Sequence, residues 1–164
     1  MNTASFSPDK IEILEFKIIK GEINSPFEFN QDKLKGHHFE LGYEVGFNLD
    51  EKLAKVDFHV QVNTQSEGNK EEGHGAFSVT FIYGIGNLAE LAIPMKKTDE
   101  LEVDGRLANA LASITYSTTR GILMTRFQGT VLASFILPVI DPNELMKSEK
   151  NNNKKTKGKN SKQQ

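Results

Sequence analysis

The sequence predicts an α+β fold in which four strands come first and the helices follow. Between residues 11 and 83, apolar and polar side chains alternate with a period of two in four separate runs. This pattern is typical of strands with one buried and one solvent-exposed face. From Asp104 to about Met124 the apolar spacing becomes helical. Because strands and helices are segregated along the chain instead of alternating, a parallel α/β sheet is not expected.

The first strand begins at Ile11 and is broken at Asn24-Ser25-Pro26. Its apolar residues change phase between Ile13 and Leu14, and one extra residue in a strand is the signature of a β-bulge. We therefore expect a bulge near the start of this strand, with regular pairing on either side of it.

The other three strands alternate without a break, at residues 39–47, 56–62 and 77–83. The second and third are joined by a short connection, about Leu49–Leu53, which predicts an antiparallel hairpin. The connection from Thr64 to Gly75 is charged and contains glycine, so we expect an exposed loop there.

The long helix carries two neighbouring stripes of side chains. The bulky stripe consists of Leu107, Leu111, Ile114, Thr118 and Ile122, and the small stripe of Ala108, Ala112, Thr115 and Thr119. The bulky stripe suits packing on the sheet, and the small stripe would let another helix approach closely. The alternative is that both stripes cover the sheet of the same chain.

The end of the chain predicts a short helix followed by a tail. Asp141 is a good N-cap, Pro142 suits the first turn and Glu144 stands at the capping-box position. No apolar residue follows Met146, and residues 147–164 carry seven Lys and one Glu. We therefore expect one domain over residues 1–146 and a disordered Lys/Asn-rich tail over 147–164.

The charge distribution argues against nucleic acid as a partner. The formal net charge is −2, but the tail alone carries +6, so residues 1–146 carry −8. An acidic body disfavours nucleic-acid binding, which needs a basic surface. No cysteine is present, which excludes disulfides, thiolate metal sites and a Cys nucleophile. With no long apolar run and a polar start, we expect a soluble cytoplasmic protein without integral membrane contact.

No pattern in the sequence assembles an active site. Gly84–Ala89 matches the dinucleotide motif GxGxxA, but the preceding strands are antiparallel and Pro94 leaves little room for the helix that this motif needs. The four histidines, His37, His38, His59 and His74, lack acidic partners at ligand spacing. We therefore expect no catalytic residues, no cofactor and no metal, and a binding protein instead of an enzyme.

An extended peptide is the ligand that the apolar residues suggest. Phe27 and Phe29 follow the break at Pro26, and Leu145 and Met146 lie on the short terminal helix. A sheet edge, an aromatic loop and a movable apolar helix can form a groove for an extended chain. Local packing is the alternative for the same side chains.

Two segments of the sequence resemble the SecB family of protein-export chaperones. Thr118-Thr119-Arg120-Gly121 stands near a helix end, and Ile136–Pro142 with Leu145 follows it. That family has an S/T-R-G signature late in its long helix and an L-P-x-I-N/D segment before its terminal helix. The N-terminal stretch Ile11–Phe29 and the hairpin 38–63 are also similar, so the resemblance covers residues 10–146.

The resemblance implies a four-stranded antiparallel sheet with a crossover connection, one long helix and one short C-terminal helix. It also implies a homotetramer, a dimer of dimers in which long helices meet between sheets, and the small stripe fits such a contact. The family holds preproteins unfolded without ATP and passes them to the translocase motor SecA. Carried over by position, its groove residues are Phe39, Leu41, Tyr43, Leu145 and Met146.

The resemblance is incomplete on the exposed sheet face. The family's motor docks on acidic groups there, and Glu22 matches one of them, whereas the outward positions Ser78 and Thr80 are not acidic. SecB-like relatives also serve toxin–antitoxin systems, so a specialised chaperone stays open as an alternative to export. A small-ligand-binding α+β protein that shares the pattern by chance is the third possibility.

Overall fold

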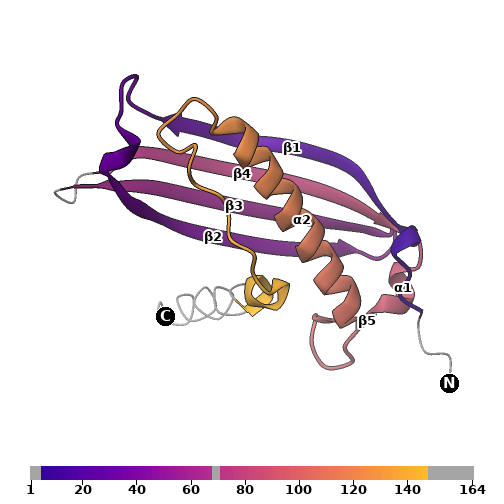
Figure 1. Cartoon of the computed structure of the whole chain (residues 1–164). Helices are drawn as coiled ribbons and strands as arrows, with labels where there is room; N and C mark the ends of the chain where they lie inside the picture. Colours follow the sequence, from indigo (N-terminus) through magenta and orange to yellow (C-terminus); the bar gives the residue numbers. More distant parts are fainter. Residues whose placement is uncertain (1–4, 68–70, 148–164) are drawn as a thin grey trace, which may run out of the picture.

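The computed structural model describes residues 5–67 and 71–147 and confirms the α+β fold (Figure 1). Four strands form the main sheet: β1 (Ile11–Asn24), β2 (Leu34–Asn48), β3 (Leu53–Ser66) and β4 (Glu71–Ile85). The long helix α2 (Gly105–Arg126) crosses one face of this sheet, which we call the inner face. Residues 142–147 form the short C-terminal helix. The predicted tail lies outside the described residues, apart from Lys147.

Smaller elements connect these parts. They are the 3-10 turns η1 (Pro8–Lys10) and η2 (Gln31–Lys33), the one-turn helix α1 (Leu88–Leu91), and the short strands β5 (Ala92–Pro94) and β6 (Leu101–Val103). The antiparallel hairpin of β5 and β6 was not predicted, because its strands are too short to show a period.

The strands are antiparallel in the order β1-β4-β3-β2, so the two edge strands are consecutive in the sequence. The connection from β1 to β2 therefore crosses over one end of the sheet (Figure 1). The predicted hairpin of β2 and β3 is confirmed, with Asn48 opposite Leu53 and a positive φ of 57° at Lys52 in the turn.

The predicted bulge in β1 is confirmed, because the pairing with β4 shifts between Ile13 and Glu15. A second shift between Ile18 and Lys20 was not predicted.

The expected exposed loop at 64–75 is wrong. Both strands extend into this region, and Thr64 and Gly73 are buried on the inner face. These small inward positions alternate with the polar residues Gln65, Glu72 and His74.

The predicted long helix is confirmed, and Asp104 caps it by accepting a hydrogen bond from the backbone N–H of Arg106 at 2.8 Å. Its buried side is centred on the small stripe and includes only Leu107 and Leu111 of the bulky stripe. The buried residues are Leu107, Leu111, Ala112, Thr115, Tyr116, Thr119 and Leu123. Of the bulky stripe, Ile114 and Ile122 are half-buried and Thr118 is exposed, so the helix is rotated from the expected phase.

The core lies between α2 and the inner faces of the four strands. Phe58, Phe81 and Tyr83 are among its largest fully buried side chains. The Tyr116 ring of α2 packs on Phe58 with centroids 5.8 Å apart, which fixes the helix over β3. In the described part of the chain, none of the helices combines the length and apolar character that crossing a membrane requires.

Candidate functional site

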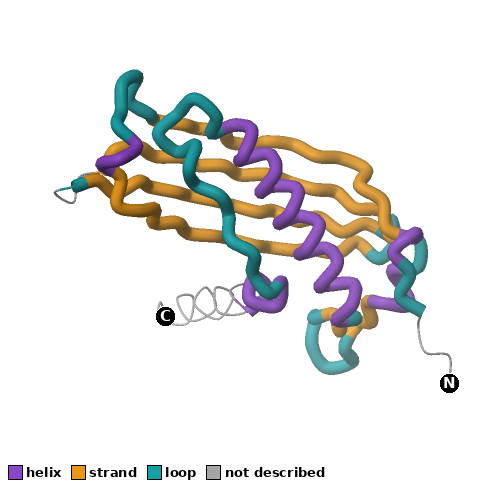
Figure 2. The backbone as a smooth tube through the Cα atoms, in the orientation of Figure 1, coloured by secondary structure: helices purple, strands orange, loops and turns teal. Residues whose placement is uncertain are grey.

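A segment without helix or strand covers the part of the inner face that α2 leaves open. This segment, residues 127–141, is called the strap. It runs from the end of α2 across the sheet towards the C-terminal helix (Figure 2). Its backbone closes short turns, with the N–H groups of Ala133 and Phe135 donating to the carbonyls of Thr130 and Leu132 at 3.0 and 2.9 Å. Because the strap is not a strand, side chains hold it on the sheet.

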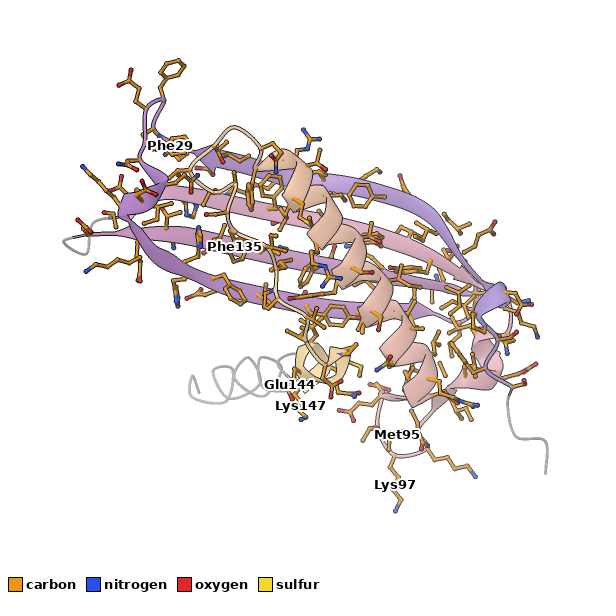
Figure 3. The ribbon with its side chains drawn as sticks, viewed as in Figure 1. Phe29, Met95, Lys97, Phe135, Glu144 and Lys147 are labelled. Atoms are coloured by element: carbon orange, nitrogen blue, oxygen red, sulfur yellow. The ribbon has the colours of Figure 1, made fainter. Side chains whose placement is uncertain are left out.

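Phe135 anchors the strap on β2 (Figure 3). Its ring centroid lies 5.5 Å from that of Phe39, 5.4 Å from that of His37 and 6.3 Å from that of Phe127. These tilted contacts are favourable for aromatic rings. Burial lowers the pKa of His37, so the neutral imidazole is favoured beneath the strap.

Two glycines of β4 let the strap approach the sheet closely. A Cβ at Gly73 would lie 2.3 Å from Cγ1 of Val131, and one at Gly75 would lie 2.9 Å from Cδ1 of Leu132. The N–H of Val131 also donates to Oγ of Ser25 in the crossover connection at 3.0 Å. The position of the strap therefore depends on the absence of side chains at these two inward positions.

The predicted groove residues lie in or against one apolar cluster. Tyr43 and Leu145 are buried members of it, and Phe39, Leu41 and Met146 are half-buried and packed against it. The terminal helix starts as predicted, because Oδ1 of Asp141 accepts from the backbone N–H of Asn143 at 3.0 Å. In this conformation the chain's own Phe135 lies on Phe39, so the strap covers part of the predicted groove.

The small stripe is turned inward. Ala112, Thr115 and Thr119 are fully buried against the sheet of the same chain, and Ala108 is half-buried. Thr115 Oγ1 lies 2.8 Å from Oη of Tyr83 in β4. This corrects the expectation that the small stripe faces another helix, and for these three residues it matches the alternative in which the stripe covers its own sheet. Among the four, Ala108 alone keeps partial exposure.

The outer face of the sheet is polar. Glu22 is exposed there and pairs with Lys20 at 3.3 Å. Ser78 Oγ lies 2.8 Å from Nδ1 of His59, and the Thr80 hydroxyl donates to Asp57 at 2.5 Å. At the two outward positions Ser78 and Thr80, β4 thus carries short hydroxyl side chains that are bonded to β3.

The GxGxxA motif at Gly84–Ala89 is not followed by the long helix that dinucleotide binding needs. The helix α1 that follows Gly84 and Gly86 has four residues, and β4 pairs antiparallel on both sides. Within residues 5–67 and 71–147, no group of three or more His, Asp or Glu side chains is placed to hold a metal ion.

Apolar side chains remain exposed on the edge strand β1 and on the loops. Those of β1 are Ile13, Leu14, Phe16 and Ile19. A hollow of about 430 Å³ beside this strand is lined by Ile18, Gly21, Ile23, Phe77 and Arg126. Phe27 in the crossover connection is 99% exposed, and Val139 in the strap is 88% exposed. The apolar surface is therefore spread around the strap and along β1.

The sequence did not predict that the rings of Phe127 and Phe135 pack against the sheet and hold the strap there. The segment 131–137 is largely apolar, but irregular structure has no period that shows which face it covers. A usable signal was the pair Gly73 and Gly75, which stand two residues apart at inward positions of a strand. Such a pair indicates that another backbone approaches closely.

No protein-family model matches the chain, and no curated protein matches it in sequence. Among solved structures it is similar to the SecB-like chaperone Rv1957 of Mycobacterium tuberculosis, in complex with a ChAD peptide from the antitoxin HigA1 (Rv1956). The TM-score is 0.58 at 11% sequence identity, and the match covers 80% of this chain and 91% of the other. At this identity the likeness shows a SecB-like fold.

Proposed function

We propose that the chain is an ATP-independent chaperone that binds extended segments of unfolded polypeptides. The proposed contact residues are Phe39, Leu41, Tyr43, Leu145 and Met146. The observation that carries the proposal is the strap, since an irregular segment closes an apolar strip of β2 on a SecB-like fold.

The strap offers a way for a client to reach this strip. To open the strap, a client would have to displace buried side chains such as Val131 and Leu132, but no ladder of backbone hydrogen bonds to the sheet. Moving Phe135 away would uncover Phe39 and the neighbouring Leu41. An unfolded chain with apolar residues could then replace these contacts, and Met146 can adapt its shape to different clients.

Client release would follow from modest affinity or from a competing receiver, because the proposal includes no nucleotide cycle. The resemblance to export chaperones makes SecA the first candidate receiver, and Glu22 on the outer face is a proposed contact for it. A hand-over of preproteins of this kind would take place in the cytoplasm.

A specialised role beside a toxin–antitoxin system is the second candidate. The observation that favours it is the solved neighbour, which holds a peptide from an antitoxin. Mass spectrometry of the polypeptides that co-purify from cells distinguishes the two roles. A mixture of preproteins supports export, and one dominant antitoxin supports the specialised role.

The proposal includes self-association to a tetramer, with the edge strand β1 as the contact surface. Ile13, Leu14, Phe16 and Ile19 are exposed on a strand whose outer edge has no neighbour in the sheet. Edge strands with exposed apolar side chains are strong candidates for pairing with another chain. A contact through α2 would have to use Ala108 and the residues beside it, because the rest of the small stripe is buried.

Calorimetric titration with a slow-folding preprotein tests the chaperone proposal. Wild type should bind with and without ATP at the same affinity. Phe39→Ala/Leu41→Ala and Leu145→Ser/Met146→Ser should each weaken binding about tenfold or more, because each removes apolar contact area. Ile93→Ala is the matched control, since Ile93 is exposed on β5, away from the strap.

Circular dichroism must show that all the variants are folded. No binding by wild type would contradict the chaperone proposal. Unchanged affinity in both folded double variants would leave these side chains with a packing role alone.

A further inference from the structure

A small notch separates α2 from the end of the strap. It has a volume of about 140 Å³. Its lining includes Ser113, Tyr116, Ser117 and Arg120 of α2, with Val139 and Ile140 of the strap. The side nearest α2 is polar and the side nearest the strap is apolar, so the notch presents two kinds of contact to one ligand.

Arg120 carries the only charge in this lining. Its side chain is half-buried, and in the described part of the chain no carboxylate forms an ion pair with it. Arg106 shows the contrast, because its guanidinium lies 2.7 Å from the carboxylate of Asp104. Asp141, which adjoins the notch in the sequence, uses its carboxylate to accept bonds from Asn143.

The hydroxyl groups of the notch already donate their protons within the chain. Tyr116 donates to the carbonyl of Pro138 at 2.8 Å, Ser117 to the carbonyl of Ser113 at 2.8 Å, and Ser113 to Oδ1 of Asn109 at 3.4 Å. Burial raises the pKa of Tyr116, and the positive charge of Arg120, which lines the same notch, lowers it. The donors left for a ligand are the N–H groups of Arg120.

We propose that the notch binds a carboxylate of the client polypeptide, held by Arg120, while the adjoining apolar side chain of the client packs on Val139 and Ile140. A planar guanidinium can bind a carboxylate through two parallel hydrogen bonds. The 88% exposure of Val139 provides apolar surface at the rim. The inference rests on the proposed function, because it extends the client surface from Leu145 and Met146 to the residues just before them.

Fluorescence anisotropy with three labelled nonapeptides tests this proposal. The first two share one sequence of apolar and aromatic residues, and the third differs from it at one internal position. The first ends in a free carboxylate, the second in an amide, and the third in an amide with one internal Glu. Wild type should bind the first or third peptide about tenfold more tightly than the second, since a hydrogen bond to a charged group contributes about that much. The gain should shrink as salt rises.

Arg120→Gln should abolish the gain and leave the affinity for the amide peptide unchanged, and Arg120→Lys should restore part of it. Arg126→Gln is the matched control, because Arg126 lines the hollow beside β1 and also forms no ion pair within the described residues. A gain with the first peptide alone identifies the chain terminus as the ligand, and a gain with the third identifies an acidic side chain.

Equal affinity of wild type for all three peptides would overturn the carboxylate site and leave the chaperone proposal standing. No binding of any peptide would overturn both. Light scattering completes the test. A lower assembly mass of Arg120→Gln would show that the carboxylate comes from a second copy of the chain, and this too would overturn the client assignment.

Discussion

The phenolic oxygen of Tyr83 lies 2.8 Å from the hydroxyl oxygen of Thr115, which joins the end of β4 to the middle of α2 inside the core. Burial raises the pKa of Tyr83 to about 12, so the phenol stays neutral over the ordinary pH range. One turn further along the same buried side of α2, the hydroxyl of Thr119 has no hydrogen-bond partner among the described residues. The two threonines are thus both buried on the same side of α2, but only the hydroxyl of Thr115 has a hydrogen-bond partner among the described residues.

Replacing each threonine by valine should have opposite results. Thr115→Val leaves the buried hydroxyl of Tyr83 without its partner and should lower the free energy of unfolding by about 1–3 kcal/mol. Thr119→Val removes a buried hydroxyl that has no partner, so its stability should be unchanged or higher. Urea unfolding of both variants measures this difference. Equal destabilisation would contradict the assigned bond.

The cap of α2 should contribute to stability in a pH-dependent way. A hydrogen bond from the Arg106 side chain lowers the pKa of Asp104 to about 2. Because the folded pKa lies below the ordinary value of about 3.9, the contribution is present above pH 4 and is lost as the pH falls through 2. Asp104→Asn keeps a capping side chain without the charge, so its melting temperature should change less than that of wild type between pH 4 and 2.

Asp104→Ala removes the cap itself and should cost about 1 kcal/mol at neutral pH. Thermal melts of the three proteins across this pH range provide the measurement. Parallel curves for wild type and Asp104→Asn would show that the charge of Asp104 does not contribute.

The strap should depend on the missing side chain at Gly73. A Cβ there would lie 2.3 Å from Val131 and 3.1 Å from the backbone oxygen of Asn24, so Gly73→Ala should cost about 1–3 kcal/mol. Gly46→Ala on β2 is the control, because nothing lies within 4 Å of its Cβ position. Limited proteolysis should cut the strap faster in Gly73→Ala alone. Equal cutting rates in the two variants would argue against a strap held by this contact.

The proposed assembly makes a prediction for the edge strand. Wild type should have the mass of a tetramer in light scattering at micromolar concentration, and Ile19→Lys should lower that mass because a charge would enter the contact. Ile93→Lys changes a similarly exposed residue on β5 and should leave the mass unaltered. A monomeric wild type would refute the assembly.

The tail should be dispensable for folding. A chain that ends at Met146 loses no apolar side chain, because residues 147–164 contain none. The contact of Lys147 with Glu144 is also lost, but exposed ion pairs of this kind contribute little. The melting temperature should change by no more than about 2 °C. A large drop would show that the tail packs on the folded chain.

The strands and helices of this fold could be predicted from the sequence, because the apolar residues in each follow a regular spacing. Alternation of apolar and polar residues predicted the strands, the change of phase at Leu14 predicted the first bulge, and helical spacing predicted the long helix. The N-cap Asp141 marked the start of the terminal helix. The orientation of α2 could not be read in this way. A stripe of small residues allows close packing on either a helix or a sheet, and Ala112, Thr115 and Thr119 pack on the sheet.

The candidate site was predicted in part. The groove residues predicted on β2 and on the terminal helix lie in or against one apolar cluster, and their role in binding polypeptides stays a prediction. The sequence did not predict that the strap covers these residues. The position of the strap depends on contacts of Phe135, Gly73 and Gly75, which come from distant parts of the chain. Such contacts leave no local pattern.

The strand order has a consequence for synthesis on the ribosome. Of the four strands, β1 is translated first, but in the sheet it pairs with β4. Ile11 can therefore pair with Ile85, and Asn24 with His74, only after β4 has been translated. Until then the nascent chain presents Ile13, Leu14 and Phe16 without a partner strand, and closing so long a loop is slow. β2, β3 and β4 can meanwhile pair in the order in which they emerge. A protein proposed to shelter unfolded chains therefore passes, during its own synthesis, through an interval in which β1 has no partner strand, and this interval ends only after β4 has been translated.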